Sequence, residues 1–302
     1  MSGANAGSSP ERRASATKKW VQGARPKTLG AAVSPVLVGT AAGALDGPIN
    51  WARAAGALVV ALALQVGVNY ANDYSDGVRD TDVARRGPVR LTATGLASPQ
   101  AVRAAAAVSF GIAAVVGAVL SLVVNPWLLL VGAAAIAGAV TYTGGPKPYG
   151  YIGLGEVMVL VFFGFVATLG SAYVQHATLP AVTWIASLAV GLPACGILLA
   201  NNVRDVDTDR ATGKRTLAVR LGAGRARTAY VLCIVGAMVA AVACGAWVPA
   251  ALVAIVAFPL AIPPVRAMLT RHDPPGLIAA LVGTVRFQLA LAALLALGLW
   301  IG

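Results

Sequence analysis

Two short acidic motifs hold most of the negative charge of this sequence. "NDYSDGVRD" runs from Asn72 to Asp80 and "RDVDTD" from Arg204 to Asp209, and both come at the end of long apolar runs. Seven of the eleven Asp and Glu residues lie in these motifs or directly beside them: Asp73, Asp76, Asp80, Asp82, Asp205, Asp207 and Asp209. Two unit negative charges about 6 Å apart repel by roughly 3 kcal/mol at an effective dielectric near 20. Each motif therefore needs cations beside it.

A hard divalent metal ion is the cation that these side chains favour. Neither motif contains His or Cys, and oxygen ligands alone favour Mg²⁺ or Ca²⁺ over zinc. Mg²⁺ usually binds through one or two carboxylates together with substrate phosphates. Two separated aspartate motifs are thus suited to clamp one diphosphate through the metal. The candidate metal ligands are Asp73, Asp76, Asp80, Asp205 and Asp209.

Basic side chains accompany both acidic motifs. "ARRGPVRL" follows the first motif and "GKRTLAVR" follows the second. Arg matches phosphate oxygens with a planar fork, and Lys acts as a compact point charge, so phosphate is the expected partner. For each residue taken singly, the alternative is the ordinary enrichment of Lys and Arg in cytoplasmic loops. The candidate anion-binding residues are Arg79, Arg86, Arg90, Lys214 and Arg215.

The spacing of the polar residues predicts two helical stripes. Gln65, Asn69, Asn72, Asp73, Asp76 and Asp80 follow one face of a helix, as do Asn201, Asp205 and Asp209, with Asn202 beside them. Lipid cannot satisfy amide side chains, so both stripes are expected to face a cavity. The alternatives are a solvated loop for the first motif and a capped helix end for the second.

A third polar insert, "TYTGGPKPYGYIGLGE", lies between later apolar runs. Its glycines and prolines fix turns, and its side chains Tyr142, Lys147, Tyr149, Tyr151 and Glu156 are candidates to line an aromatic pocket. The alternative for Tyr142 and Tyr149 is the aromatic belt of a membrane interface.

The elements that position these motifs are membrane helices. Of 302 residues, 58% are apolar and 11% are charged, against about 45–50% and about 25% in globular proteins. Windows of about 20 residues predict an all-α membrane protein with nine transmembrane helices: 28–45, 53–72, 101–124, 126–142, 152–175, 180–203, 227–248, 250–268 and 276–301. Residues 21–302 then form one domain, and residues 1–20, rich in Ser, Ala and Arg, are expected to be a disordered tail.

The charge distribution predicts the orientation of these spans. With a cytoplasmic N-terminus, 21 of the 23 Lys and Arg residues lie on the cytoplasmic side, in loops or within three residues of them. The net charge of +12 is thereby explained by topology in a cell membrane, with anionic lipid or phosphate as partner, and nucleic acid is unnecessary. Both acidic motifs are expected on this same face, in two matching halves around a central cavity.

These motifs resemble those of a known family. "NDYSDGVRD" is similar to the NDxxDxxxD pattern of the UbiA superfamily of intramembrane aromatic prenyltransferases, and "RDVDTD" supplies its second DxxxD. More narrowly, residues 23 to about 225 resemble the 1,4-dihydroxy-2-naphthoate polyprenyltransferases of menaquinone synthesis. The resemblance rests on "GARPKTL", "LQVGVNYANDYSDG", "RRGPVRL", "YTGGPKPYGYIGLGE" and "NNVRDVDTDRATGKRTLAVRLG". One departure is Asp80, where that subfamily usually has Gly and places its acid at the position of Asp82.

The resemblance implies nine helices around a cavity that opens to the cytoplasm and to lipid. It implies that Asp73, Asp76, Asp205 and Asp209 hold Mg²⁺ on a polyprenyl diphosphate, with Asn69 and Asn72 in support, and that Arg86, Arg90, Lys147, Lys214 and Arg215 neutralise the leaving group. The implied product is demethylmenaquinone, formed with loss of CO₂. The alternatives are a transferase of the same fold with another acceptor, such as a phosphoribosyl group, and a cation-coupled transporter.

Overall fold

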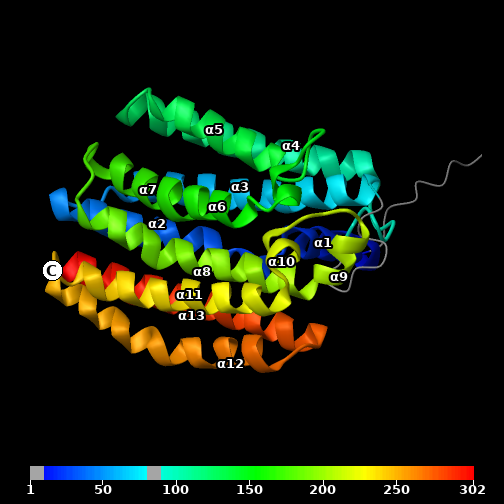
Figure 1. Ribbon diagram of the computed structural model, residues 1–302. Helices are drawn as coiled ribbons and strands as arrows, with labels where there is room; N and C mark the ends of the chain where they lie inside the picture. Colours follow the sequence, from blue (N-terminus) through cyan, green and yellow to red (C-terminus); the bar gives the residue numbers. More distant parts are fainter. Residues whose placement is uncertain (1–9, 80–89) are drawn as a thin grey trace, which may run out of the picture.

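The computed structural model describes residues 10–79 and 90–302, and over these residues all regular secondary structure is helical (Figure 1). The long helices are α3 (Trp51–Val78), α4 (Pro99–Val124), α8 (Val182–Arg204), α11 (Ala223–Cys244) and α13 (Pro274–Ile301). Two further spans are built from segments: α6 (Gly155–Val159), η4 (Leu160–Val166) and α7 (Ala167–His176) form one, and η5 (Pro249–Ala261) and α12 (Ile262–Thr270) form the other. The fold class predicted from composition is confirmed.

The number of spans differs from the predicted nine. Helices occupy all nine predicted places, but only seven in the described residues are long and apolar enough to cross a membrane. An eighth candidate is the pair Thr17–Thr28 and Gly30–Asp46, which bends by 54° and contains α2 (Gly30–Gly43). The fourth predicted span, 126–142, holds α5 (Leu128–Thr141), which has 14 residues and would rise only about 21 Å.

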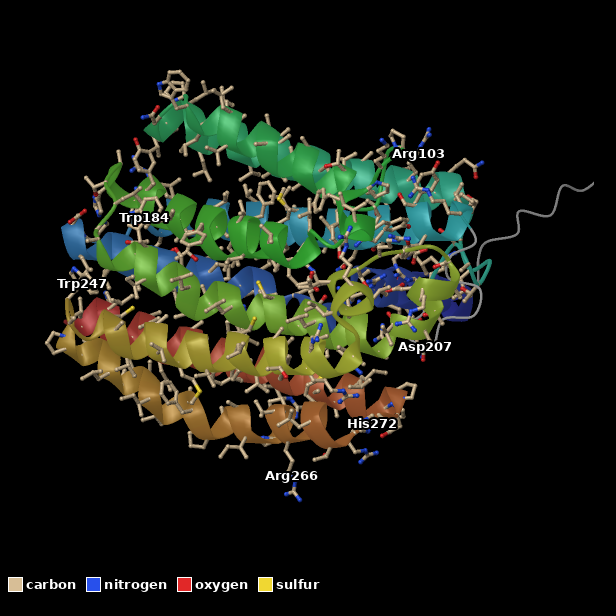
Figure 2. The ribbon with its side chains drawn as sticks, in the orientation of Figure 1. Arg103, Trp184, Asp207, Trp247, Arg266 and His272 are labelled. Carbon is tan, nitrogen blue, oxygen red and sulfur yellow. The ribbon has the colours of Figure 1, made fainter. Side chains whose placement is uncertain are left out.

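The two ends of the helix bundle carry different side chains. Trp51, Trp127, Trp184, Trp247 and Trp300 are all exposed and stand at helix ends that share one side of the bundle. Figure 2 shows Trp184 and Trp247 at that end and Asp207 and His272 at the other. Exposed tryptophans are typical of a membrane interface, so this end marks one boundary of the apolar layer. The acidic motifs lie at the opposite end.

The segment predicted as a disordered tail is in part helical. Helix α1 covers Pro10–Ala24, whereas residues 1–9 lie outside the described part of the chain. The Trp20 ring packs edge-on against Tyr70, with centroids 5.7 Å apart, and the Tyr70 hydroxyl donates to the Trp20 carbonyl at 2.8 Å. Composition alone missed this contact, because the partner of Trp20 lies 50 residues further along the chain.

Helix α8 is the centre of the packing. It is the most buried of the candidate spans, and it shares one apolar core with α2, α11 and α13. The span next to it contains η4, a π-helical segment, whose Gly164 meets Gly191 of α8 backbone to backbone. Small residues permit such close approach between membrane helices. Because α8 is held on several sides, its polar end at Asn201 is fixed in position.

Segment η5 is an unusually long 3₁₀ helix of 13 residues. Its buried residues Ala251, Ala254 and Ala257 recur every third position, which is the period of a 3₁₀ helix. A Cβ placed on Gly298 of α13 would lie 2.4 Å from the Ala250 carbonyl oxygen. The narrow alanine face thus lets η5 and α13 pack closely, far from the acidic motifs.

A GxxxG pair on α2 gives a test of this packing. A Cβ on Gly39 would lie 2.2 Å from the Thr168 carbonyl oxygen of α7, and one on Gly43 would lie 2.7 Å from that of Ala172. We expect Gly39→Leu to lower the free energy of unfolding by about 1–3 kcal/mol, because the helices must separate. Thermal unfolding in detergent measures this. Gly111→Leu is the control, since a Cβ there meets nothing within 4 Å; equal losses for both variants would contradict the prediction.

Candidate active site

The first acidic motif continues α3 without a break. Helix α3 ends at Val78, six residues beyond the predicted end of its span, so the "NDYSD" residues have helical geometry. The predicted stripe is confirmed over the described residues, since its members are all buried: Gln65, Asn69, Asn72, Asp73 and Asp76. Asp80 lies outside the described part of the chain. One row of polar side chains on α3 therefore faces inward, whereas the rest of the helix carries mainly apolar side chains.

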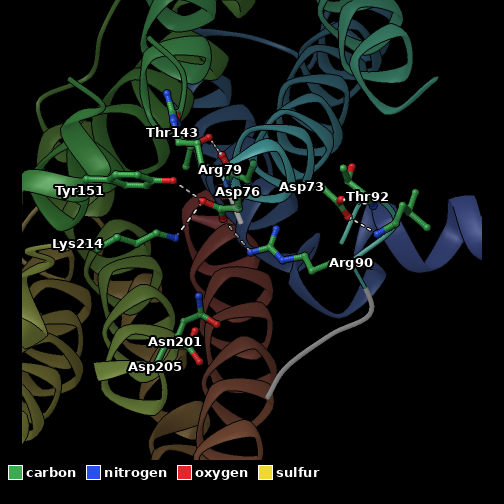
Figure 3. Close-up of polar contacts among 12 residues, drawn as sticks. Asp73, Asp76, Arg79, Arg90, Thr92, Thr143, Tyr151, Asn201, Asp205 and Lys214 are labelled. Carbon is green, nitrogen blue, oxygen red and sulfur yellow. Dashed lines mark hydrogen bonds and ion pairs between the residues drawn. The ribbon is translucent and has the colours of Figure 1, made fainter. Parts of the chain in front are cut away.

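Asp76 is the hub of the polar network (Figure 3). Its Oδ2 lies 3.2 Å from Arg90 Nη2, and its Oδ1 lies 2.9 Å from Lys214 Nζ. The Tyr151 hydroxyl donates to the same Oδ1 at 2.5 Å. All of these carboxylate contacts are charge-assisted, which makes them strong, and the Asp76 side chain is only 4% exposed. Three segments far apart in the chain therefore converge on one carboxylate.

The second motif forms a bent helix end. Helix α8 ends at Arg204, Asp205 is the junction residue, and α9 (Val206–Ala211) follows. The Asp205 amide donates to the Asn201 carbonyl at 3.2 Å and the Asp209 amide to the Asp205 carbonyl at 2.8 Å. This i→i+4 ladder keeps Asn201, Asp205 and Asp209 in helical register, as their spacing predicts. Arg204 holds both oxygens of Asp205, at 2.8 and 2.7 Å.

The two motifs meet at one site. The Lys214 amide donates to the Asp209 carbonyl at 2.8 Å, while its ammonium pairs with Asp76, 138 residues earlier in the sequence. Residues of both motifs line a small polar cavity of about 60 Å³: Asn72, Asp76, Asn201, Asn202 and Asp209, together with Arg90, Tyr142, Thr143, Tyr151 and Lys214. The expectation that two distant acidic motifs share one site is therefore supported by this geometry.

Asp73 has different surroundings from Asp76. Its Oδ2 accepts the Leu91 amide at 2.7 Å and its Oδ1 accepts the Thr92 amide at 2.9 Å, and the residue is 1% exposed. In this structure both oxygens thus fix the chain just after Arg90, which positions that guanidinium on Asp76. A metal-binding role for Asp73 stays a prediction.

The third insert closes over the site through backbone contacts. Arg79 donates to the Thr143 carbonyl and, at 2.6 Å, to the Gly145 carbonyl. The Thr143 hydroxyl in turn donates to Asn72 Oδ1 at 2.7 Å. The Tyr151 ring lies near two cations, with Arg79 at 5.6 Å and Lys214 at 4.6 Å from its centroid. Arg79 and Asn72 therefore position the insert that carries Tyr151.

Tyr142 and Tyr149 form the aromatic part of the site. Their ring centroids are 5.4 Å apart, and the Tyr149 hydroxyl donates to the Gly138 carbonyl at 2.8 Å. Burial raises the pKa of Tyr149 to about 12, so its phenol stays neutral and keeps donating at physiological pH. Tyr142 lines the polar cavity and the larger cavity described below. The predicted aromatic wall is thus present, in place of an interfacial belt.

Other candidates stand outside the polar cavity. Lys147 is exposed and belongs to the lining of neither cavity, and Arg215 is exposed as well, with its amide donating to the Tyr151 carbonyl at 2.8 Å. Asn202 donates to the buried Glu156 carboxylate at 2.8 Å. Arg86 lies outside the described residues. Direct substrate contacts by Lys147, Arg86 and Arg215 stay predictions.

A second, much larger cavity adjoins the polar one. Its volume is about 730 Å³, and its lining follows α3 from Ala57 to Asn72, a rise of about 22 Å along the helix. Most of the wall is apolar, with contributions from α4, α5, η4, α7 and α8, and Gln65 and Asn69 lie within it. Arg25, Asn72, Tyr142 and Asn201 line both cavities. An apolar channel therefore ends at the polar site.

The donor groups of the polar cavity fit a hard metal ion bound with an anion. Its oxygen donors in the described residues include the carboxylates of Asp76 and Asp209 and the amides of Asn72 and Asn201, and its cations there are Arg25, Arg90 and Lys214. Over residues 10–79 and 90–302, no three acidic, His or Cys side chains are grouped closely enough to form a metal site by themselves. Mg²⁺ commonly uses only one or two carboxylates and completes its shell with phosphate and water.

Three residues of the site were missed as site residues by sequence reasoning. Tyr151 was considered only as a pocket aromatic, and nothing local marks its hydrogen bond to Asp76. Arg204 precedes Asp205 in the motif itself, so its adjacency to an acid was the available signal. Arg25 lies in "GARPKTL", and its place at the meeting of the two cavities depends on how the chain folds after α1.

Comparisons with known proteins agree with this arrangement. The chain is 52% identical over 212 residues to a 1,4-dihydroxy-2-naphthoate octaprenyltransferase of Mycobacterium tuberculosis, covering 70% of this chain and 73% of the relative. It is 35% identical over 301 residues to the Escherichia coli protein of the same name, covering 96% and 98%.

Solved structures share the fold. A UbiA homolog from Aeropyrum pernix K1 has a TM-score of 0.64 at 19% identity, over 91% of this chain and 97% of that one. A homolog from Archaeoglobus fulgidus bound to DMAPP and Mg²⁺ has a TM-score of 0.62 at 17% identity, over 92% and 99%. The sequence profile of the UbiA prenyltransferase family matches residues 32–289, and this chain belongs to that family.

Proposed function

We propose that this protein transfers a polyprenyl group from a polyprenyl diphosphate to 1,4-dihydroxy-2-naphthoate, with release of diphosphate and CO₂. The observation that carries the proposal is the direct junction of an apolar cavity of about 730 Å³ with a polar cavity lined by both acidic motifs. The names of the relatives with 35% and 52% identity support the choice of acceptor. The direct product is demethylmenaquinol, which a separate two-electron oxidation converts to demethylmenaquinone.

The donor fits the two cavities head to tail. Its isoprenoid tail is apolar and suits the channel along α3, while its diphosphate suits the polar cavity between Asp76 and Asp209. Mg²⁺ bound there by Asp76 and Asp209, with Asp73, Asp80 and Asp205 as further candidate ligands, would supply positive charge to the leaving diphosphate. The tail length is set by the channel and by any opening to lipid.

The chain's own cations act on the same leaving group. Arg90 and Lys214 lie within 3.2 Å of Asp76. A change of side-chain rotamer would therefore bring each of them to a diphosphate bound in the same cavity. When the allylic C–O bond breaks, the diphosphate leaves with the bonding electrons, and its new negative charge is stabilised by these fixed donors. Tyr151, which donates to Asp76, is placed to redirect its hydroxyl to a phosphate oxygen.

The second half of the reaction needs an electron-rich ring and a dry site. The ring carbon that bears the carboxylate attacks the allylic cation, and a C–C bond forms. The C–CO₂⁻ bond then breaks, returning its electron pair to the ring and releasing CO₂. The apolar wall keeps water from the cation, and Tyr142 at the junction of the cavities is suited to pack against the ring.

The orientation proposed is that of a cell-membrane protein with its site on the cytoplasmic face. The end of the bundle with exposed tryptophans faces away from the acidic motifs (Figure 2), and most Lys and Arg residues gather near those motifs, as the positive-inside rule requires. A transporter would place its carboxylates near mid-membrane, whereas Asp76 and Asp205 stand at helix ends.

The first prediction concerns the acidic motifs. We expect Asp76→Asn and Asp205→Asn each to lower kcat by at least about 100-fold, because the charge that holds the metal and orders the cations is lost. The measurement is prenylated naphthoquinone formed by purified protein in detergent, beside thermal unfolding to verify the fold. Asp207→Asn is the matched control, since that side chain is 92% exposed in the same motif; wild-type rates in the two buried variants would refute the metal clamp.

The second prediction concerns the metal. Excess EDTA is expected to stop turnover and Mg²⁺ to restore it, because oxygen ligands and diphosphate bind this ion together. Inorganic diphosphate should likewise raise the melting temperature of the protein much more with Mg²⁺ present than without it. Full activity in excess chelator would rule out the metal role.

The third prediction concerns the channel. Gly170 of α7 lines the large cavity, and a Cβ placed on it meets no atom within 4 Å. Gly170→Trp is therefore expected to reduce kcat/KM at least about 10-fold for a long polyprenyl diphosphate, while dimethylallyl diphosphate is used as before. Gly111→Trp, at an exposed position outside the cavity lining, serves as control. An equal loss for long and short donors would exclude the channel as the tail site.

A further inference from the structure

Arg25 has a backbone conformation that is costly for its residue type. It follows the last residue of α1 with φ 54° and ψ 64°, the left-handed region, which is unfavourable for a residue other than glycine. Pro26 comes next, and a residue before proline is normally pushed to extended conformations. A conformation with two local penalties persists only where the surroundings enforce it.

Hydrogen bonds enforce this conformation from both sides. Asn69 of α3 is 4% exposed and donates through Nδ2 to the Ala24 carbonyl at 2.9 Å. The Arg25 carbonyl accepts both the amide and the hydroxyl of Thr28, each at 2.9 Å. Asn69 was a candidate substrate ligand because it lies on the polar stripe. In this structure its side-chain amide donates to the turn that carries Arg25 and fixes that turn.

The side chain of Arg25 stands where the two cavities meet. It belongs to the lining of both, together with Asn72, Tyr142 and Asn201. Other cations nearby are tied to the acidic motifs: Arg90 and Lys214 to Asp76, and Arg204 to Asp205. Arg90 and Lys214 line the polar cavity but not the large one, and Arg204 lines the large cavity but not the polar one. Arg25, which directly follows α1, lines both.

We propose that Arg25 determines acceptor specificity by binding the carboxylate of the aromatic acid. The proposal rests on the proposed function, which requires an acceptor with an apolar ring and one carboxylate. A guanidinium fork pairs both oxygens of a carboxylate in one plane, and Tyr142, which also lines both cavities, suits the acceptor ring. Holding the carboxylate at the junction sets the ring carbon that bears it against the end of the prenyl channel.

The test compares two ligands that differ by this carboxylate. 1-Hydroxy-2-naphthoate and 1-naphthol are titrated into wild type, Arg25→Gln and Arg25→Lys in detergent with EDTA, and binding is followed by thermal shift. The readout thus does not require turnover. KM values for the acceptor and for the polyprenyl diphosphate are then measured with Mg²⁺. Lys18→Gln is the matched control, an exposed cation on α1 that lines neither cavity.

The expected result is a loss of ligand discrimination. Wild type and Lys18→Gln should prefer the carboxylate ligand by about 10-fold or more, as a charge-assisted pair implies, and Arg25→Gln should bind both ligands alike. Arg25→Lys should fall between, because it keeps the charge and loses the fork. The acceptor KM should rise by a similar factor while the donor KM changes less than about twofold.

Three results would overturn the inference. An unchanged preference in Arg25→Gln excludes carboxylate binding, and a rise confined to the donor KM assigns Arg25 to diphosphate instead. Equal weakening of both ligands indicates a role in folding the turn only. The proposed function fails if wild type does not prenylate 1,4-dihydroxy-2-naphthoate. In that case, a preference for the carboxylate ligand that depends on Arg25 would still show that the site binds an aromatic acid.

Discussion

The buried carboxylate of Asp76 is the constraint around which the site is organised. A charge at the end of a membrane helix is expensive unless it is paired and hydrogen-bonded, and Asp76 meets this demand with Arg90, Lys214 and Tyr151. These partners come from three separate segments. The segment after α3, the insert before α6 and the segment after α9 must therefore close over one end of the bundle together, so the acid that we propose to serve the chemistry also assembles the site.

Periodicity anticipated what is local and missed what is not. The stripe from Gln65 to Asp76 is a property of one helix, so spacing alone predicted it. The i→i+4 ladder through Asp205 is equally local and survives the bend between α8 and α9. In contrast, Asp73 accepts hydrogen bonds from the amides of Leu91 and Thr92. These contacts depend on the path of the loop after α3, which the spacing of residues along a helix does not predict.

The same distinction explains the differences in the helix count and at the N-terminus. Hydropathy predicted an apolar segment at α5 correctly but gave it too many residues, because Pro126 and Trp127 before the helix and Tyr142 after it are apolar or aromatic and yet belong to turns. The region around Trp20 reads as a polar tail in composition, yet one aromatic contact with Tyr70 anchors it. Window averages cannot register a single contact across 50 residues.

The apolar channel and the charged polar cavity share a junction, and the two cavities need walls of different chemistry. The channel needs side chains that bind no water, whereas the polar cavity needs dense fixed charge, because charge stabilisation is strongest where water is scarce. Among the described residues, only Arg25, Asn72, Tyr142 and Asn201 belong to both linings. A boundary of amides, one phenol and one guanidinium can contact an apolar ring and an anion at once, so the proposed bond between a hydrocarbon cation and an aromatic acid is best made at this boundary.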